Sequence, residues 1–284
     1  MFYRLLSFLP LPLLYTLGWP CYLLLYHVAG YRKATVLQNL RQAFPEQSEK
    51  EITVLAKKFY RQLVDVALEI VRTRRMSAAE LRRRVTVSNG ELLQRYTGDA
   101  QQPVIVLTIH QGNWEWMLHG VSLALDVPID PVYKPLHNSA MDRLMVEIRS
   151  RFGARPIPMA SAPRDILRRR REFRLFVMVA DQAPIRRERS YWTTFLNAEA
   201  AFYEGPEAIA RLTGYPVLFA RCRRRARGYY EVTFEEVARP PYPKDAHPVL
   251  DKYVRLAEQA IREEPQSWLW SNRRWKRERR REGG

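Results

Sequence analysis

Short apolar runs alternate along the chain with longer segments in which apolar positions recur every three or four residues. The runs at residues 104–109 and 175–179 are almost wholly apolar, which indicates strands buried on both faces. Strands that alternate with helices predict an α/β fold, a single domain with a mixed central sheet flanked by helices. Further strands or extended segments are expected at residues 85–87, 131–133, 154–159, 217–221 and 229–234.

The helical segments carry clear start signals and apolar stripes. Ser48 and Glu51 form a capping box that opens a long amphipathic helix, and a second, shorter helix begins at Ser77. In the first of these helices the apolar positions share one face: Ile52, Leu55, Phe59, Leu63, Val66 and Ile70. Other helices are expected at residues 91–96, 113–125, 140–152, 163–173, 205–213 and 248–263.

The segment from Leu5 to Gly30 is the one stretch of this chain that could enter a bilayer. It has about the 20 apolar residues that a span requires, and it lacks the small-residue cleavage site of a secretory signal. Pro10 and Pro20 would break a straight helix, so a kinked anchor, a helical hairpin within one leaflet and a clean span all stay open. We therefore expect residues 1–32 to be a membrane anchor and residues 33–284 to be the functional domain.

The charge balance adds a second indication of a membrane. The formal net charge is +17, which suits anionic lipid, an acidic protein or nucleic acid. No zinc-finger spacing or aromatic RNA-binding block accompanies the basic residues, so nucleic acid is not an expected partner. An anionic membrane surface fits better, and many of the charges will lie on solvated helix faces. The arginine-rich clusters are at residues 72–75, 82–84, 168–171, 221–227 and 273–281.

The cysteines and histidines of the chain predict neither a disulfide framework nor a metal site. Cys21 and Cys222 lie far apart in different kinds of segment and form no disulfide framework, and Cys222 looks like a small apolar strand residue. The five histidines show no metal-ligand spacing, so we expect no metal site.

A histidine follows the first buried run directly. After His110 come Gly112, which permits a sharp bend, and Glu115, five positions beyond the histidine. Residues five apart do not face each other in a continuous helix, so these two side chains meet only if the backbone bends between them. A strand, turn and helix of this kind place both at the carboxyl edge of a sheet, where open α/β sheets carry their sites. The pattern is typical of a general base oriented by an acid; the alternative is a helix start in which the histidine caps or packs.

The block at residues 110–115 (HQGNWE) resembles the HxxxxD/E signature of glycerolipid acyltransferases. Its glutamate and its Gly-Asn-Trp filling look like the branch that acylates lipid A in Gram-negative bacteria, the late acyltransferases of lipid A biosynthesis. The likeness covers most of the chain, and the order of the blocks is more specific than any one of them. The other blocks are residues 34–46 (ATVLQNLRQAFPE), 149–153 (RSRFG), 181–182 (DQ), 205–214 (GPEAIARLTG) and 268–276 (WLWSNRRWK).

The resemblance implies a membrane-associated O-acyltransferase that moves a fatty acyl chain from acyl carrier protein to a hydroxyl of a lipid A precursor. His110 would take the proton of the acceptor alcohol, and Glu115 would fix the imidazole tautomer. No cofactor is expected besides the acyl donor. The expected partners are the acidic acyl carrier protein, an anionic phosphorylated glycolipid and the membrane. A donor of this kind implies the cytoplasmic side of the cell inner membrane.

The remaining expected site residues would contact the substrate. Asn113 would orient a ring nitrogen or cap the helix. Arg149 would bind a phosphate or sugar-acid carboxylate of the acceptor bidentately; the alternative is an arginine that faces the helix dipole. Asp181 ends an apolar strand, where an acid is unfavourable unless it is paired, so it would pair with Arg149 or hold a substrate hydroxyl. Gln182 and Lys134 complete the expected substrate contacts.

Three departures from the family pattern leave the acceptor and the acyl chain length open. The chain has Phe-Leu-Asn at residues 195–197, where the family usually carries Phe-Phe-Gly, and larger residues at 201–204, where small residues or threonine are frequent. Asn272 stands where a histidine is frequent. The alternatives are the same chemistry on another acceptor, such as an amino-acid lipid or a pigment headgroup, or a non-catalytic basic scaffold that binds membranes.

Overall fold

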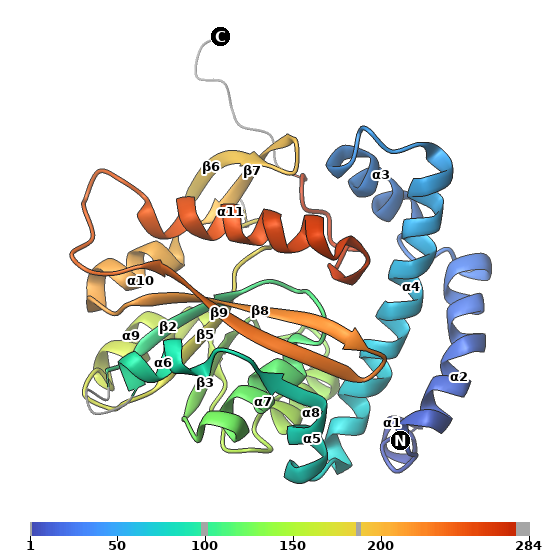
Figure 1. Ribbon diagram of the computed structural model, residues 1–284, viewed down its shortest axis with the longest axis horizontal. Helices are drawn as coiled ribbons and strands as arrows, with labels where there is room; N and C mark the ends of the chain where they lie inside the picture. Colours follow the sequence, from blue (N-terminus) through green and yellow to red (C-terminus); the bar gives the residue numbers. More distant parts are fainter. Residues whose placement is uncertain (1, 98–101, 186–188, 277–284) are drawn as a thin grey trace.

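The computed structural model describes residues 2–97, 102–185 and 189–276, and it confirms the expected α/β class with a mixed central sheet in a single domain (Figure 1). Part of the last arginine-rich cluster, beyond residue 276, lies outside the described residues. Within them the main sheet has seven strands, in the order β1 (Val85–Val87), β9 (Tyr229–Ala238), β8 (Val217–Ala226), β2 (Val104–Thr108), β5 (Leu175–Val179), β3 (Ile129–Tyr133) and β4 (Ile157–Pro158).

The centre of this sheet is parallel. β2 pairs in parallel with β5 on one side and with β8 on the other, whereas β8 and β9 pair antiparallel. Thr108 lies opposite Val179 at the carboxyl ends of β2 and β5. The segments that follow these two strands, residues 109–113 and 180–182, therefore leave the sheet side by side. This register positions the candidate site.

Helices cover both faces of the sheet, and the alternation along β2 explains how. Ile105 and Leu107 belong to one apolar core, together with residues of α11 (Pro248–Glu263). Val104 and Val106 belong to the other core, together with residues of α7 (Trp114–Leu125). Because successive side chains of a strand point to opposite faces, a strand buried on both faces reads as continuously apolar. Figure 1 shows α11 and α7 on opposite sides of the strands.

Most of the remaining helices begin where the sequence pattern expects. The capping box is formed, since the Ser48 side chain accepts from the Glu51 N–H and the Glu51 carboxylate accepts from the Ser48 N–H. The basic helix expected at residues 163–173 is shorter and ends at residue 168. The helices are α4 (Glu49–Arg72), α5 (Ala78–Arg84), α6 (Gly90–Thr97), α8 (Ser139–Arg149), α9 (Ala162–Arg168) and α10 (Gly205–Thr213).

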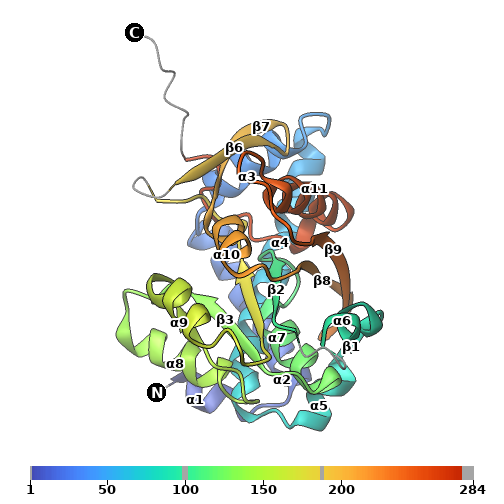
Figure 2. The same cartoon turned by 90° about the vertical axis from the view of Figure 1, so that its left-hand side faces the viewer.

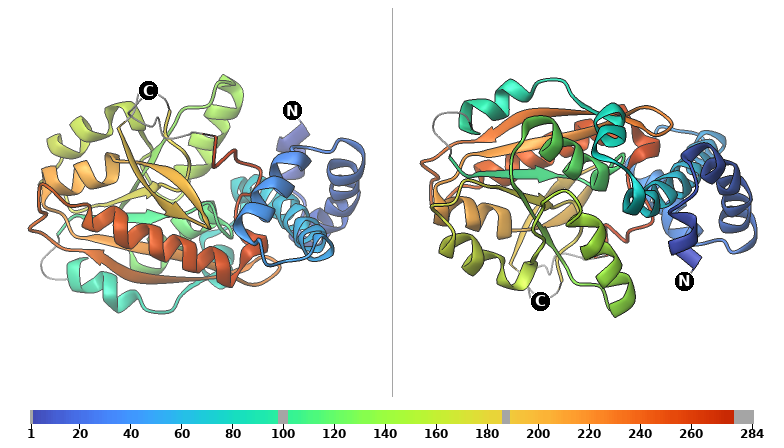
Figure 3. Two further views of the ribbon diagram at one scale, coloured as in Figure 1. Left: turned by 90° about the horizontal axis from the view of Figure 1, so that it is seen from above. Right: turned by 90° about the horizontal axis from the view of Figure 1, so that it is seen from below.

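The apolar N-terminal segment is broken at Pro10, as expected, but the second helix continues through Pro20, where the sequence predicts a break. α1 (Phe2–Leu6) ends before Pro10, α2 (Leu11–Leu23) begins directly after it, and a π-helical turn (Leu24–Val28) precedes α3 (Lys33–Ala43). α2 packs along α4, and these N-terminal helices gather at one end of the molecule (Figure 3). Among the described residues, none of the helices has the length and apolar character to cross a bilayer.

Much of this segment exposes large apolar side chains. Leu14 and Tyr22 are buried against the rest of the protein, whereas Trp19 on the same helix is 53% exposed. Two arginines lie over exposed rings: Arg61 over Trp19 and Arg75 over Phe8. The exposed apolar surface comprises Leu5, Phe8, Leu13, Leu17, Trp19, Leu23, Leu24 and Val28.

The hairpin of β6 (Ser190–Phe195) and β7 (Ala198–Tyr203) was not expected from the sequence. Its two turn residues, Leu196 and Asn197, have φ of 49° and 65°, as two-residue hairpin turns require. The Leu196 N–H donates to Glu258 of α11, and the Asn197 amide donates to the carbonyl of Ala43. Figure 2 shows the hairpin beside α3 and α11. The departure at residues 195–197 thus lies in a turn that packs between helices.

Candidate active site

His110 and Asp181 meet at the carboxyl ends of β2 and β5. The His110 Nδ1 lies 2.6 Å from Asp181 Oδ1, and the His110 backbone N–H donates to Asp181 Oδ2 at 3.0 Å. The two residues are far apart in the chain, and only the parallel register of the two strands brings them together. This pairing corrects the sequence expectation, in which Glu115 contacts the imidazole and Asp181 contacts Arg149 or a substrate hydroxyl.

Asp181 is held as a buried carboxylate. It is 2% exposed, and its Oδ2 also accepts a hydrogen bond of 2.7 Å from the indole N–H of Trp268. Burial opposes ionisation, but the electrostatic interaction with His110 and the hydrogen bonds from its ring, from its backbone N–H and from Trp268 leave the pKa of Asp181 below its ordinary value. Asp181 is therefore an acceptor at neutral pH.

An ionised Asp181 fixes the tautomer of His110. Because a carboxylate only accepts hydrogen bonds, the ring proton lies on Nδ1 and the lone pair lies on Nε2. The Gln182 amide nitrogen lies 3.4 Å from this Nε2. The side chain of His110 is 18% exposed, so solvent or a substrate reaches the ring. Trp114 packs edge-on against the ring, with 5.1 Å between centroids. The arrangement leaves Nε2 as an accessible base.

The bend after His110 depends on Gly112. Its φ is +60°, and a Cβ at this position would lie 2.5 Å from the carbonyl oxygen of Cys222 on β8, so neither the conformation nor the space admits a side chain. The Gly112 N–H donates to the carbonyl of Ser267 and is therefore not free to donate to a substrate. Burial raises the pKa of the Cys222 thiol to about 12. Cys222 is thus a packing residue, as expected, and not a nucleophile.

Glu115 binds Arg149 instead of His110. The guanidinium donates from Nε to Glu115 Oε2 at 2.9 Å and from Nη2 to Glu115 Oε1 at 2.5 Å, a bidentate pair. Glu115 lies in the first turn of α7 and is buried, and Arg149 ends α8 with its side chain 19% exposed. The bend at Gly112 therefore does not turn Glu115 toward the imidazole.

Asn113 caps α7. Its Oδ1 accepts from the Trp116 N–H at 2.9 Å, and its Nδ2 donates to Glu69 of α4 at 2.8 Å. Of the two roles expected for Asn113, the structure shows the helix cap. Lys134 follows β3 with its side chain exposed, and Gln182 is exposed beside His110.

A comparison with protein-family models now gives the chain its family. The model of the bacterial lipid A biosynthesis acyltransferases matches residues 1–277. The chain belongs to this family. A comparison with curated proteins found no match. Family membership makes the chain an acyltransferase of lipid A biosynthesis, and the resemblance inferred from residues 110–115 and the later blocks is confirmed at this level.

Two residues around the turn at residues 110–113 of this acyltransferase were not assigned a role from the sequence. Trp268 orients Asp181, and Gln111 ties the turn to α11 because its amide donates to the carbonyl of Ala260 at 2.7 Å. The Leu269 N–H donates to the His110 carbonyl at 3.0 Å. The family resemblance included residues 268–276, but it did not show where this block lies. Only the fold shows that it packs against residues 110–112.

Proposed function

We propose that this chain transfers a fatty acyl group from acyl carrier protein to a hydroxyl of a phosphorylated lipid A precursor, with His110 as the general base. The observation that supports this most directly is the Nδ1 contact of His110 with a buried, ionised Asp181. It leaves a basic Nε2 at an accessible edge of the ring, as proton abstraction from an alcohol requires.

The proposed reaction is a direct transfer without an acyl-enzyme. The acceptor alcohol gives its proton to Nε2 of His110 as its oxygen forms a bond to the thioester carbonyl carbon. The carbon–sulfur bond then breaks, and the imidazolium returns the proton to the departing thiolate. Asp181 stabilises the imidazolium between these steps, as the carboxylates of catalytic triads do. General-base catalysis of this kind contributes about 10²–10⁴-fold.

Arg149 is proposed to bind the anionic part of the acceptor, and Glu115 to orient it. Nε and Nη2 of Arg149 face Glu115, which leaves Nη1 for a phosphate or carboxylate. Glu115 is then a positioning residue that acts through Arg149, in place of the imidazole contact that the sequence led us to expect. Gln182 is proposed to donate to the reacting oxygen from its place beside Nε2, and Asn113 contributes through the cap of α7. Lys134 is proposed as an outer phosphate contact.

The partners and the location follow from this reaction. An acyl carrier protein donor is acidic, which suits a chain of net charge +17, and it implies catalysis at the cytoplasmic side of the inner membrane. Residues 1–32 are proposed to attach the protein, and residues 33–284 to carry the chemistry. The exposed apolar side chains of α2 and the neighbouring arginines support attachment to an anionic bilayer surface. No cofactor beyond the acyl donor is proposed.

The proposal is tested by acyl transfer with the detergent-solubilised full chain. Acyl carrier protein thioesters of several chain lengths are offered with a phosphorylated lipid A precursor, and the product is read by mass spectrometry. A gain of one acyl group that is lost in His110→Ala is the expected result; His137→Ala, in an exposed loop, is the matched control. Transfer only to an amino-acid lipid would support the alternative acceptor. If the protein binds lipid but transfers no acyl group from any donor to any acceptor, the non-catalytic scaffold is favoured and the proposal is overturned.

A further inference from the structure

Glu69 is a buried carboxylate on α4 that lies beside the turn at residues 110–113. Its side chain is fully buried. Oε1 accepts a hydrogen bond from the Tyr15 hydroxyl at 2.7 Å, and Oε2 accepts from the Asn113 amide at 2.8 Å and from the Tyr230 hydroxyl at 2.7 Å. One side chain thus joins α2, β9 and the first residue before α7.

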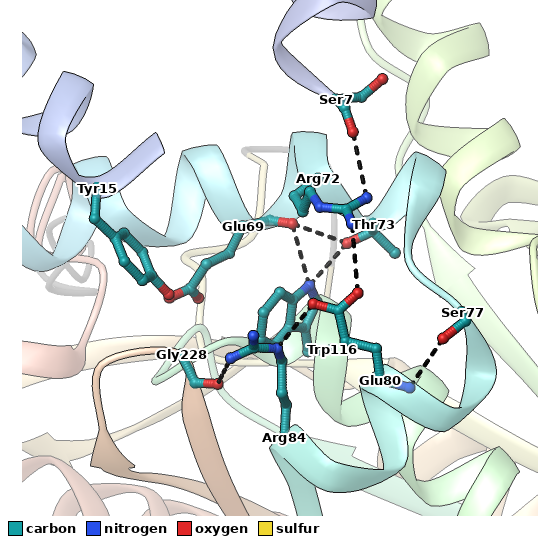
Figure 4. Close-up of polar contacts among 10 residues, drawn as sticks. All are labelled: Ser7, Tyr15, Glu69, Arg72, Thr73, Ser77, Glu80, Arg84, Trp116 and Gly228. Atoms are coloured by element: carbon teal, nitrogen blue, oxygen red, sulfur yellow. Dashed lines mark hydrogen bonds and ion pairs between the residues drawn. The ribbon is translucent and has the colours of Figure 1, made fainter. Parts of the chain in front are cut away.

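The backbone at Glu69 holds the same part of α7. The Glu69 carbonyl accepts from the indole N–H of Trp116 at 3.2 Å, and the same indole N–H lies 2.7 Å from the Thr73 hydroxyl (Figure 4). The Thr73 hydroxyl in turn donates to the Glu69 carbonyl. Asn113 and Trp116 therefore both take their position from one turn of α4.

A carboxylate at this place opposes folding unless its hydrogen bonds are made. Burial raises the pKa of Glu69 above its ordinary value, although three hydrogen-bond donors and the nearby charge of Arg224 act against this shift. An apolar side chain of similar size would fill the space between α2, α4 and α7 without that penalty. What an apolar side chain cannot supply is an acceptor for the Asn113 amide and for the hydroxyls of Tyr15 and Tyr230.

We propose that Glu69 is a positioning residue for the acyl transfer: through Asn113 it fixes the turn that carries His110. The inference rests on the proposed function of His110. Asn113 uses one end of its amide to cap α7 and the other to bind Glu69, so its side chain fixes both the helix start and the distance of the turn from α4. A displacement of about 1 Å in such a segment lowers the rate by about 10²-fold.

Tyr15 extends the same connection to the N-terminal helices. It lies on α2, which also exposes Leu13, Leu17 and Trp19, and its hydroxyl is the donor to Oε1 of Glu69. Two hydrogen bonds, from Tyr15 to Glu69 and from Asn113 to Glu69, thus connect α2, the helix proposed to rest on the membrane, with the turn at His110. Tyr15→Phe, which keeps the ring and loses only the hydroxyl, removes this part of the connection.

Three variants test the proposal against a matched control. Glu69→Leu removes the acceptor, and Asn113→Ser keeps a capping oxygen for α7 but loses the amide donor to Glu69. Glu69→Gln keeps the contacts, since its oxygen accepts from Asn113 and Tyr230 while its amide donates to the Tyr15 hydroxyl. The control is Glu207→Gln: Glu207 is equally buried but accepts from the N–H groups of Val249 and Leu250, at the start of α11. That start lies roughly 16 Å along α11 from the Ala260 contact with the turn.

The expected result is a fall in kcat of about 10²-fold in Glu69→Leu and in Asn113→Ser, with KM for the acceptor changed by less than about threefold. Glu69→Gln and Glu207→Gln should retain kcat per folded molecule. An unchanged kcat in Glu69→Leu would overturn the proposal, and so would a loss in Glu69→Gln as large as in Glu69→Leu. If Glu69→Leu does not fold, the kcat of Asn113→Ser alone tests the proposal, and an unchanged kcat in that variant would overturn it.

A second measurement separates this proposal from that of the reaction. The rate at which diethylpyrocarbonate modifies His110 is followed by mass spectrometry, with the exposed His27 and His137 as internal references. We expect this rate to change in Glu69→Leu and Asn113→Ser and to stay at the wild-type value in Glu207→Gln. If wild-type protein transfers no acyl group, the proposed function fails, but this change still supports the inference that Glu69 fixes the turn that carries His110. An unchanged rate in both variants would overturn it whether or not the chain is active.

Discussion

At the scale of single residues, two buried carboxylates of this site have different basic partners. Asp181 accepts from the imidazole of His110, and Glu115 accepts two parallel bonds from Arg149. An imidazole becomes charged only when it takes a proton, whereas a guanidinium is charged at every physiological pH. In the proposed mechanism, the carboxylate beside the imidazole therefore stabilises a charge that forms during the reaction, whereas the carboxylate beside the guanidinium holds a permanent charge in place.

Asp181→Asn is predicted to lower kcat by about 10²–10⁴-fold with a small effect on stability. The amide has almost the same shape, but its nitrogen can face Nδ1 and so favours the wrong imidazole tautomer. Steady-state kinetics of acyl transfer across a range of pH measures the effect.

Glu115→Gln is the matched control, because it changes a buried carboxylate of the same site that does not touch the ring. We expect it to raise KM for the phosphorylated acceptor through Arg149 more than it lowers kcat. The reverse pattern, with kcat lost in Glu115→Gln and retained in Asp181→Asn, would restore the pairing that the sequence led us to expect.

The sequence predicted His110 and the turn at Gly112, but not the partner of the imidazole. The five-residue spacing from His110 to Glu115 is visible in the chain, whereas the approach of Asp181 depends on how β2 and β5 pair. Thr108 lies opposite Val179, and a different register would have brought another residue to the ring. Local patterns do not contain this information.

At the scale of elements, periodicity predicted most of the helices and the buried strands, because apolar stripes and the capping box at Ser48 are local signals. The β6–β7 hairpin was not predicted because its first turn residue, which has positive φ, is Leu196. Glycine or asparagine is usual at such a position, so the local sequence signal for a hairpin turn is absent there. Of the two breaks expected from prolines in the N-terminal segment, the one at Pro10 is present, whereas α2 continues through Pro20. How α2 would pack on α4 depended on tertiary contacts that no local pattern records.

Helix α7 carries a histidine that makes its packing sensitive to acid. His119 is fully buried against Phe152, with ring centroids 5.1 Å apart. Burial lowers the pKa of His119 from its ordinary value of 6.5 to about 4, and the nearby Glu115 carboxylate opposes the shift only in part. Between these two values the unfolded chain binds a proton that the folded chain does not, so stability is lost as the pH falls.

His119→Met is predicted to flatten the acid side of the stability profile. The shift in pKa corresponds to a loss of about 2 kcal/mol in the free energy of unfolding between about pH 7.5 and about pH 5. Urea unfolding at both pH values measures it. In His119→Met this difference should shrink by that amount, whereas His137→Gln, at an exposed site, should keep the wild-type difference. Equal pH dependence in the wild type and His119→Met would show that the buried imidazole does not control the acid response.

At the scale of the whole molecule, apolar and basic surfaces lie together at the N-terminal end. Phe8, Trp19 and Val28 are each more than half exposed, and arginines lie over the rings of the first two. An apolar side chain left in water opposes stability, whereas in a bilayer interface it contributes about 0.8 kcal/mol per buried methylene. Each arginine near an anionic surface adds about 1 kcal/mol. The two effects act on the same end of the protein, so they are expected to reinforce each other.

The triple variant Phe8→Ser, Trp19→Ser, Val28→Ser is therefore predicted to bind anionic phospholipid vesicles at least about tenfold more weakly than the wild type, since about 1.4 kcal/mol corresponds to a factor of ten. Flotation of the full chain with vesicles measures this. The matched control replaces three apolar residues that are also exposed but lie on other elements, Leu136, Met141 and Leu212, and it should bind as the wild type does. Added salt should weaken wild-type binding without abolishing it, because the apolar contribution is not screened. Equal binding by the triple variant and the control would mean that charge alone holds the protein at the membrane, and the N-terminal helices would then need another partner.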